Sequence, residues 1–472
     1  MIELYPHQNE IAVAVRQAMR GHQSVLVNGA TGIGKTVFAS YVAQSASAKG
    51  KRILFCVHRD TLIHQTARTF EEFGIQFGYI AAGMSFEKWK PVHIASIQTL
   101  ARRLDKIPVP DLLVIDEAHL AAAKTWSAVV DCYRAQGAKI LGLSGSPTRL
   151  DGKPLSNLFD TMVMGPSVRW LIDNGFLSEY VAYCPSKIDL SGVKTRMGDF
   201  NQTELAETMD KPSITGDAVE HYRKLAMGTR AVCYGVSVAH SKHVAETFNA
   251  AGIAAGHIDG TTPKSEQQRL IRDFADGKIL VLCNVELITT GFDLSAQVGR
   301  DVPIETMIGL RPTQSLALHL QTIGRALRRK PKPAILLDHA GNILRHGLPD
   351  DEREWDLSGQ TKRAKKRATE DDALPIRQCE QCYTVHRPAP VCPSCGFVYP
   401  NRARQIETVA GELQQVNPSV VRKIEVREKK REQSTATSFE DLVELGRARG
   451  YKNPSAWASH VWQARALRRA IA

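Results

Sequence analysis

The sequence lacks any apolar run near the roughly 20 residues that a membrane span requires. Its first ten residues, MIELYPHQNE, also lack the charged-then-apolar pattern of a secretory signal. We therefore expect a cytoplasmic protein with no membrane partner. Disulfides are rare in that compartment, so the nine cysteines need another explanation. The C-terminal tail contains no convincing nuclease constellation, so any cleavage of a substrate would need another chain.

The chain has 472 residues, which is too long for a single core and predicts about three domains. Hydrophobic residues make up 43% of it, which permits a packed globular protein. The net charge is +12. A charge of this sign favours a polyanionic partner, although charge alone does not identify it.

One stretch organises the rest of the chain. Residues 29–36 read GATGIGKT, which fits the pattern G-x-x-x-x-G-K-[ST]. The apolar residues 25–27 predict a buried strand before it, and residues 37–48 predict a helix after it. Glycines allow backbone N–H groups to turn toward phosphate oxygens. We expect a bound nucleotide here, with phosphate and Mg²⁺ contacts from Gly29, Gly32, Gly34, Lys35 and Thr36.

A second motif follows the apolar residues 112–115, which predict a strand of a parallel sheet covered on both faces. The next residues read DEAH and lie at the carboxyl end of that strand, the edge where open α/β sheets bind ligands. We expect Asp116 to hold Mg²⁺. We expect Glu117 to orient and deprotonate the attacking water, because phosphoryl transfer depends on positioning and charge stabilisation.

Together with other segments in the same order, these motifs resemble superfamily 2 helicases and translocases over roughly residues 1–340. The resemblance is to DEAH-box proteins of the restriction-subunit-like and phage-type DNA motors more than to RNA-unwinding relatives. It rests on eight segments: 4–8, 29–36, 58–65, 93–100, 116–119, 144–149, 289–293 and 321–328. The implied cofactors are ATP and Mg²⁺.

The resemblance implies roles for further residues. Gln8 matches the residue that pairs with adenine, and Tyr5, where many relatives have Arg, could stack on the base. Contacts to a nucleic-acid backbone are implied for His58, Arg59, Thr99, Thr289 and Thr290. Residues 321–328 resemble the motif Q-x-x-G-R-x-x-R, and Gln321 is expected at the nucleotide. Arg325 and Arg328 are three residues apart, so on a helix they share a face and could reach the γ-phosphate.

The implied fold is α/β, with two tandem RecA-like parallel-sheet domains, a small zinc ribbon and a helical tail. Strand–helix alternation is visible in both domains, but only the first carries a phosphate loop. We expect ATP between the two domains. The predicted boundaries are 1–150 for the ATP-binding domain, 151–212 for a linker or insertion, 213–345 for the second domain, 346–374 for a charged linker, 375–402 for the ribbon and 403–472 for a charged segment and helical tail.

Four of the cysteines form two CxxC pairs separated by nine residues: Cys379, Cys382, Cys392 and Cys395. This pattern predicts four thiolate ligands for a closed, structural Zn²⁺ site. The ribbon could contact DNA, a protein partner or the motor itself. The tail has Trp457 and Trp462 among arginines, and these tryptophans could bind nucleic acid or pack the tail together.

The sequence thus predicts an ATP hydrolase, namely a DNA helicase or translocase acting in replication, recombination or repair on single-stranded or forked DNA. Protein partners could bind through the ribbon or the tail. The alternatives are a motor subunit of a restriction-type or other complex, an RNA helicase, and a zinc-dependent DNA-binding scaffold with a vestigial ATPase. The intact Lys35, Asp116, Glu117 and Arg325 argue against the scaffold.

Overall fold

The structure is a computed structural model of the chain. It describes residues 2–58, 60–121, 124–149, 153–184, 195–196, 199–200, 205, 209, 212–285, 287–288, 294–358, 376–399, 432–433, 436, 438–449, 451, 453–459 and 461–462. Residues 1–399 form one compact unit and residues 400–472 a second.

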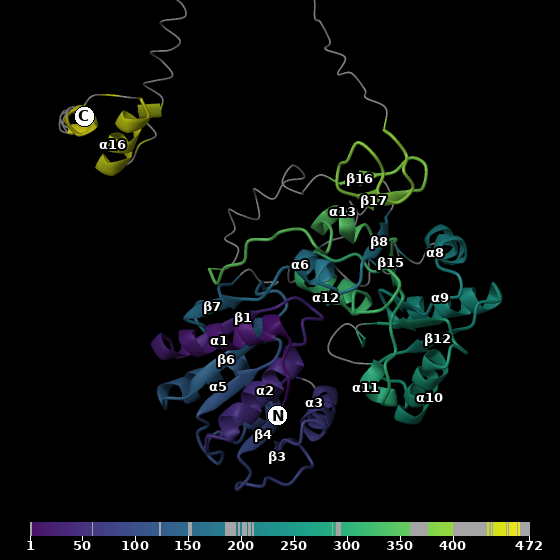
Figure 1. Cartoon of the computed structure of the whole chain (residues 1–472), viewed down its shortest axis with the longest axis horizontal. Helices are drawn as coiled ribbons and strands as arrows, with labels where there is room; N and C mark the ends of the chain where they lie inside the picture. The colour runs from purple at the N-terminus through teal and green to yellow at the C-terminus, as the bar shows by residue number, and fades with distance from the viewer. Residues whose placement is uncertain are drawn as a thin grey trace, which may run out of the picture. The chain divides into compact units, whose positions relative to one another are not determined.

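The first sheet has seven parallel strands in the order β3-β4-β2-β5-β6-β1-β7 (Figure 1). Its strands are β1 (Ser24–Asn28), β2 (Ile53–Val57), β3 (Phe77–Ile80), β4 (Val92–Ser96), β5 (Leu112–Ile115), β6 (Lys139–Ser144) and β7 (Thr161–Met164). Its helices are α1 (Pro6–Gly21), α2 (Lys35–Ser47), α3 (Asp60–Glu72), α4 (Ile97–Ala101), η1 (Ala118–Leu120) and α5 (Lys124–Ala135).

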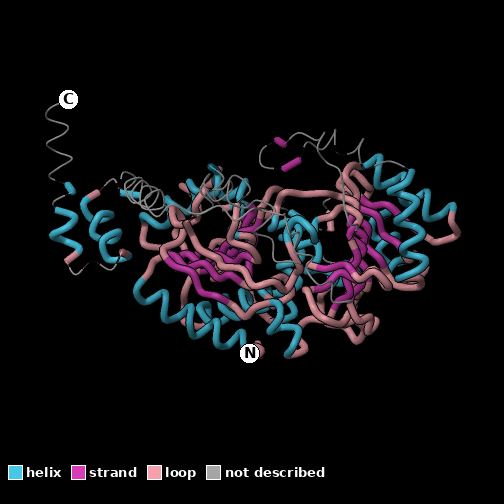
Figure 2. The backbone as a smooth tube through the Cα atoms, turned by 90° about the horizontal axis from the view of Figure 1, so that it is seen from above, coloured by secondary structure: helices cyan, strands magenta, loops and turns pink. Residues whose placement is uncertain are grey.

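Side-chain alternation explains why this sheet is covered on both faces. Neighbouring residues of a strand point to opposite faces. Val25 and Val27 belong to the apolar cluster that includes residues of α1, α2 and α3, whereas Leu26 belongs to the cluster of α4 and α5. Figure 2 shows the strands lying between helices. The continuous apolar runs in the sequence reflect this two-sided burial.

The second sheet has eight strands in the order β12-β13-β11-β14-β15-β8-β17-β16, of which the first six are parallel. Its strands are β8 (Tyr180–Tyr183), β11 (Ala231–Tyr234), β12 (Ala255–Ile258), β13 (Val281–Asn284), β14 (Thr306–Gly309), β15 (Ala334–Asp338), β16 (Arg377–Gln378) and β17 (Thr384–His386). Its helices are α8 (Pro212–Leu225), α9 (Val238–Ala250), α10 (Lys264–Ala275), α11 (Leu294–Val298), α12 (Leu316–Ala326) and α13 (Asn342–His346). The predicted α/β class with two parallel-sheet domains is confirmed.

Residues 151–212, expected as a linker with some added structure, contribute to both sheets. β7 extends the first sheet beside β1, and β8 joins the second sheet beside β15. Between them lies the short helix α6 (Val168–Asp173), and after β8 comes a two-stranded hairpin of β9 (Thr195–Arg196) and β10 (Asp199–Phe200). The segment is therefore a crossing between the two sheets that takes part in both.

The first residues of the predicted charged linker, 346–374, also differ from the prediction. Asp350 and Asp351 are buried, because arginines from other parts of the chain pair with their carboxylates. These two residues, predicted as part of a charged linker, therefore pack into the first unit. The basic block 362–367 lies outside the described residues.

The four-cysteine region is built into the second sheet. β17 pairs antiparallel with β8, and β16 pairs antiparallel with β17. The side-chain amide of Gln378 also donates to the Cys184 carbonyl, at 2.9 Å. Of the three contacts left open for the ribbon, the structure therefore shows the one with the motor itself.

The second unit contains α16 (Phe439–Ala448) and a further helical stretch at 454–459. Ser438 caps α16 by accepting from the Asp441 amide. Trp457 packs on Gly446 and Tyr451, and Trp462 packs edge-on against Phe439. Both tryptophans therefore contribute to packing, while Arg465, Arg468 and Arg469 lie outside the described residues.

Candidate active site

The loop between β1 and α2 has a backbone that favours glycine at two positions. Gly32 and Gly34 have φ values of +96° and +84°. A Cβ on Gly32 would lie 2.6 Å from Leu177 Cδ2, and one on Gly34 would lie 2.4 Å from Gln8 Nε2. The loop is therefore restricted by its own backbone and by two neighbours from distant parts of the chain.

Gln8 lies on α1 with its amide against this loop. Its Nε2 donates to the Ile33 carbonyl at 2.9 Å, and its Oε1 accepts from the Tyr5 amide at 3.0 Å. The buried side chain thus ties the start of α1 to the end of the phosphate loop. The role of Gln8 in adenine recognition stays a prediction.

An aromatic cluster surrounds the N-terminal segment. His7 lies 4.4 Å from Phe176 and 5.9 Å from Trp170, measured between ring centroids, and Tyr5 lies 5.2 Å from Phe176. Tyr5 is nevertheless 53% exposed, and its role in stacking on a base stays a prediction. Trp170 and Phe176 are not among the predicted site residues, because no function could be assigned to residues 151–212 from their sequence.

The charge of Lys35 acts on both acidic residues of the DEAH motif, Asp116 and Glu117. Lys35 Nζ donates to the Gly29 carbonyl at 3.2 Å, and Thr36 follows directly in the first turn of α2. Burial and the charge of Glu117 raise the pKa of Asp116 to about 6. Burial also disfavours the charged form of Glu117, but the charges of His119, Lys35 and Arg325 lower its pKa overall. Two adjacent, half-buried carboxylates fit a divalent cation, which would stabilise their ionised forms.

Glu117 is also unusual in its backbone. Its φ is +49°, in the left-handed region that non-glycine residues rarely adopt. The Glu117 amide donates to Asp116 Oδ1 at 3.0 Å, which helps to hold this turn. Strained backbone of this kind persists where the surroundings enforce it, and it is frequent at active sites.

His119 connects this acidic turn to the end of β6. Its Nδ1 lies 3.5 Å from Glu117 Oε2 and 3.1 Å from Ser144 Oγ. Ser144 Oγ in turn donates to the Ser146 carbonyl at 3.0 Å. Burial lowers the pKa of His119, although the charge of Glu117 acts in the opposite direction. His119 thus lies between Glu117 and the turn at residues 144–146 and contacts both.

α12 brings residues of the second sheet against this site. Gln321 Nε2 donates to Glu117 Oε2 at 3.2 Å. A Cβ on Gly324 would lie 2.4 Å from Thr31 Cβ, so the helix contacts the phosphate loop directly. The positive charge of Arg325 acts on both Asp116 and Glu117. Lys35, Asp116, Glu117, Gln321 and Arg325 are therefore gathered at one site.

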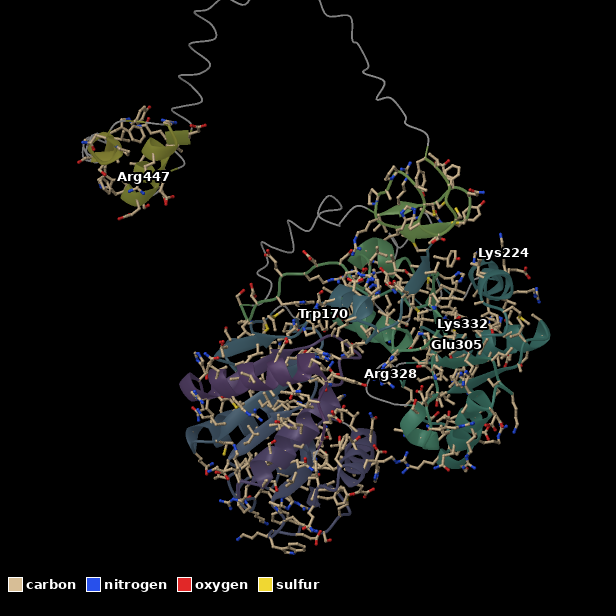
Figure 3. The ribbon with its side chains drawn as sticks, viewed as in Figure 1. Trp170, Lys224, Glu305, Arg328, Lys332 and Arg447 are labelled. Carbon is tan, nitrogen blue, oxygen red and sulfur yellow. The ribbon has the colours of Figure 1, made fainter. Side chains whose placement is uncertain are left out.

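Arg328 is placed differently from the expectation. α12 ends at Ala326, and the backbone of Arg328 forms an antiparallel bridge with Leu177. Arg328 thus lies beyond the helix that carries Arg325, although the charges of both arginines act on Tyr234. Their approach to the γ-phosphate stays a prediction. Figure 3 shows Arg328 and Trp170 in the region between the two sheets. The sequence spacing could not reveal where the helix ends.

Two of the expected nucleic-acid contacts lie side by side. β2 and β4 are neighbours, so His58 and Thr99 follow their carboxyl ends at one edge of the sheet. The Gln98 amide donates to the His58 carbonyl at 3.3 Å. Arg59, Thr289 and Thr290 lie outside the described residues.

The four clustered cysteines have the geometry of a metal site. Their Sγ atoms all lie within 4.8 Å of one another. Cys379 and Cys395 are 3.7 Å apart, as are Cys382 and Cys392. Thiolates about 2.3 Å from a tetrahedral Zn²⁺ would be about 3.8 Å apart. The donor set therefore fits Zn²⁺ with no ligand position left open.

Metal analysis tests this site. We expect about one Zn²⁺ per chain, and we expect Cys392→Ser to lose the metal and to lower the unfolding temperature, because β16 and β17 extend the second sheet. Cys132→Ser, which lies outside the cluster, is the matched control. Retention of a full metal equivalent by the Cys392 variant would show that the ion binds elsewhere.

Comparisons with known proteins agree with this geometry. Residues 1–149 match the family model described as the type III restriction enzyme, res subunit, and residues 217–330 match the helicase conserved C-terminal domain. A 51.5 kDa protein of a Lactococcus phage is 34% identical over 362 residues, which cover 76% of this chain and 74% of the phage protein. The putative ATP-dependent helicase IRC3 of Saccharomyces cerevisiae is 29% identical over 345 residues.

The yeast match covers 68% of this chain but only 48% of the yeast protein, so the chain spans about half of that relative. The solved structure of the DUF1998 helicase MrfA bound to DNA has a similar fold, with a TM-score of 0.51 and 15% identity. That match covers 73% of this chain and 50% of the other. Within the described residues, no helix is long and apolar enough to cross a membrane. By its two domains, its motifs and its relatives, the chain belongs to the superfamily 2 helicases, which are ATP-dependent motors.

Proposed function

We propose that ATP is bound and hydrolysed in the cleft between the first sheet and α12. Lys35 and the loop amides hold the phosphates, while Thr36 and Asp116 hold Mg²⁺. Glu117 accepts a proton from the attacking water. Arg325 stabilises the charge that develops on the departing phosphate, and Arg328 supports it from beyond the end of α12. The observation that carries this assignment is the direct approach of Gln321 and Gly324 to Glu117 and Thr31.

Hydrolysis can be coupled to movement through the same contacts. Gln321 donates to Glu117, the proposed catalytic base. A movement or a change of charge at Glu117 would therefore alter this hydrogen bond and with it the position of α12. A movement of Glu117 would also displace His119, which forms a hydrogen bond with Ser144. The two domains would then open and close once in each cycle and grip a nucleic-acid backbone alternately.

We propose DNA as the nucleic acid, in single-stranded or forked form, and a task in replication, recombination or repair. The net charge of +12 favours a polyanion. The restriction-enzyme family model and a fold neighbour described as bound to DNA favour DNA over RNA. We assign contacts with the nucleic-acid backbone to His58 and Thr99, and we therefore expect movement to be largely independent of sequence.

Hydrolysis assays with different nucleic acids test this function. ATP turnover is measured without nucleic acid and with single-stranded DNA, forked DNA and RNA, beside Glu117→Gln. We expect DNA to stimulate turnover and the variant to lose at least about 10²-fold, because the general base is removed. Stimulation by RNA alone would overturn the DNA assignment. Unchanged turnover in the variant would overturn the role of Glu117.

A second candidate is a motor subunit within a larger complex. The match of residues 1–149 to a restriction-enzyme subunit favours it. Such a chain would show weak DNA-stimulated hydrolysis alone and a strong increase once a protein partner is present. The ribbon and the tail are the proposed partner-binding regions. Full activity of the purified single chain would argue against this candidate.

A further inference from the structure

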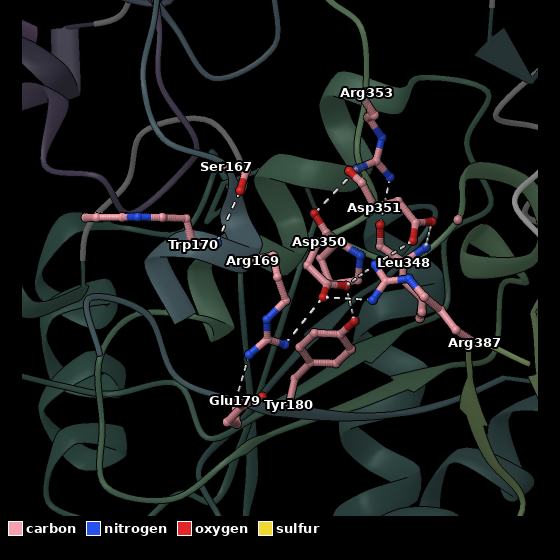
Figure 4. A network of polar contacts seen from close by, with 12 residues as sticks. Ser167, Arg169, Trp170, Glu179, Tyr180, Leu348, Asp350, Asp351, Arg353 and Arg387 are labelled. Carbon is pink, nitrogen blue, oxygen red and sulfur yellow. Dashed lines mark hydrogen bonds and ion pairs between the residues drawn. The ribbon is translucent and has the colours of Figure 1, made fainter. Parts of the chain in front are cut away.

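A turn after α13 buries two adjacent carboxylates. The side chains of Asp350 and Asp351 are 1% and 4% exposed. Asp351 Oδ2 accepts from the Leu348 amide at 2.7 Å, and Asp350 accepts from the Tyr180 hydroxyl on β8. Two buried negative charges require nearby cations, because burial disfavours an unpaired charge. Figure 4 shows the arginines that supply them.

The four-cysteine ribbon supplies one of these cations. Arg387 follows β17 directly, and its Nη2 lies 2.9 Å from Asp351 Oδ1 and 3.2 Å from Asp350 Oδ1. Since β17 pairs with β8, which also carries Tyr180, the ribbon approaches the turn along the sheet edge. Arg387 is thus the ribbon side chain that neutralises both carboxylates.

The same turn forms a wall beside the proposed ATP site. A cavity of about 140 Å³ is lined by Thr31, Gly145 and Gly324 together with Asp351, Arg353 and Trp355 of this turn. Arg353 stiffens this wall by donating to the carbonyls of Leu348 at 2.7 Å and Asp351 at 2.9 Å. Thr31 belongs to the phosphate loop, and Gly324 is the residue of α12 that contacts it. A shift of the turn would therefore change the cavity wall next to the contact between Gly324 and Thr31.

A second arginine ties the turn to α6. Arg169 Nη1 lies 3.5 Å from Asp350 Oδ2, and its Nη2 lies 2.9 Å from Glu179 Oε1. The next residue, Trp170, belongs to the aromatic cluster around His7. The turn is therefore held from the ribbon side by Arg387 and from the α6 side by Arg169.

We propose that Arg387 is a positioning residue for ATP hydrolysis, which makes the zinc ribbon a brace of the motor cleft. Its guanidinium holds the turn with Asp350 and Asp351, and the turn holds the cavity wall beside Thr31 and Gly324. Without Arg387, Asp351 loses the ion pair at 2.9 Å, among the described residues only the more distant charge of Arg353 acts on its buried carboxylate, and we expect the turn to shift toward solvent. Misplacement of about 1 Å near a reacting centre can lower a rate by about 10²-fold.

The test compares three variants of the full chain. Arg387→Ala removes the brace. Arg377→Ala is the matched control, because Arg377 also lies in the ribbon but stacks on Tyr399, with its Cζ 3.5 Å from the ring centroid. Arg387→Ala with Asp351→Asn removes the uncompensated charge and keeps an acceptor for the Leu348 amide. Each variant is assayed for zinc content, hydrogen exchange of residues 348–355, and kcat and KM for ATP.

We expect Arg387→Ala to keep its zinc, to exchange about tenfold faster over residues 348–355 and to lose about 10- to 100-fold in kcat. Arg377→Ala should behave like the wild type, and the double variant should recover most of the loss. Unchanged exchange and kcat in Arg387→Ala would overturn the inference, as would an equal loss in Arg377→Ala. The inference rests on the proposed ATP site. A wild type without turnover would contradict that site, while hydrogen exchange would still decide whether the brace exists.

Discussion

Replacement of Arg325 by alanine is expected to lower kcat for ATP hydrolysis by about 10³–10⁵-fold, the range known for arginines that contact the transferred phosphate. Arg325 is positioned by α12, which approaches the phosphate loop so closely that Gly324 admits no side chain. Its charge acts on Asp116 and Glu117, so it is near the expected γ-phosphate. A positive charge fixed at this point stabilises the transition state more than the bound nucleotide.

The matched control is Arg329→Ala, which removes an exposed arginine four residues further along the same segment. We expect it to change kcat by less than about twofold, because a solvated side chain contributes little to preorganised electrostatics. Binding of a fluorescent ATP analogue should be nearly unchanged in Arg325→Ala, since the loop and Lys35 remain. A loss below about tenfold in kcat for Arg325→Ala would contradict its assigned role.

A single methyl group on Gly324 is expected to reduce DNA-stimulated hydrolysis by about 10²-fold. In Gly324→Ala the new Cβ would lie 2.4 Å from Thr31 Cβ and 2.6 Å from Thr31 Cγ2. Thr31 Cβ is attached to the backbone, so a change of rotamer cannot relieve the overlap. α12 must then move away from the phosphate loop, and Gln321 and Arg325 move with it.

Gly260→Ala serves as the control for this experiment. A Cβ on Gly260 would have no atom within 4 Å, and its φ is not in the left-handed region. We expect this variant to retain wild-type turnover and both variants to keep similar unfolding temperatures. If Gly324→Ala hydrolysed ATP at the wild-type rate, the close contact between α12 and the loop would not belong to the active state.

The first sheet and its motifs were largely predictable from the sequence. Apolar runs such as residues 112–115 are long enough to mark buried strands, and the phosphate loop and DEAH residues follow such runs directly. Four cysteines in two CxxC pairs predicted a compact cluster, which the structure contains. These features depend on local pattern, which a single sequence displays.

The remaining features depend on contacts between distant residues. The end of α12 at Ala326 is set by the bridge between Arg328 and Leu177, which no spacing reveals. Asp350 was predicted as part of a charged linker because its partners, Arg169 and Arg387, are 181 and 37 residues away in the sequence. The approach of Gly324 to Thr31 likewise requires the arrangement of both sheets. Long-range pairs of this kind carry no periodic signal.

The central claim is that ATP hydrolysis in this cleft moves the chain along DNA. Displacement of streptavidin from biotinylated single-stranded DNA measures this movement directly and does not require strand separation. The account predicts that the wild type accelerates release only when ATP and Mg²⁺ are present, and that Glu117→Gln does not. Normal DNA-stimulated ATP hydrolysis without any ATP-dependent release, from either end of the strand, would contradict it.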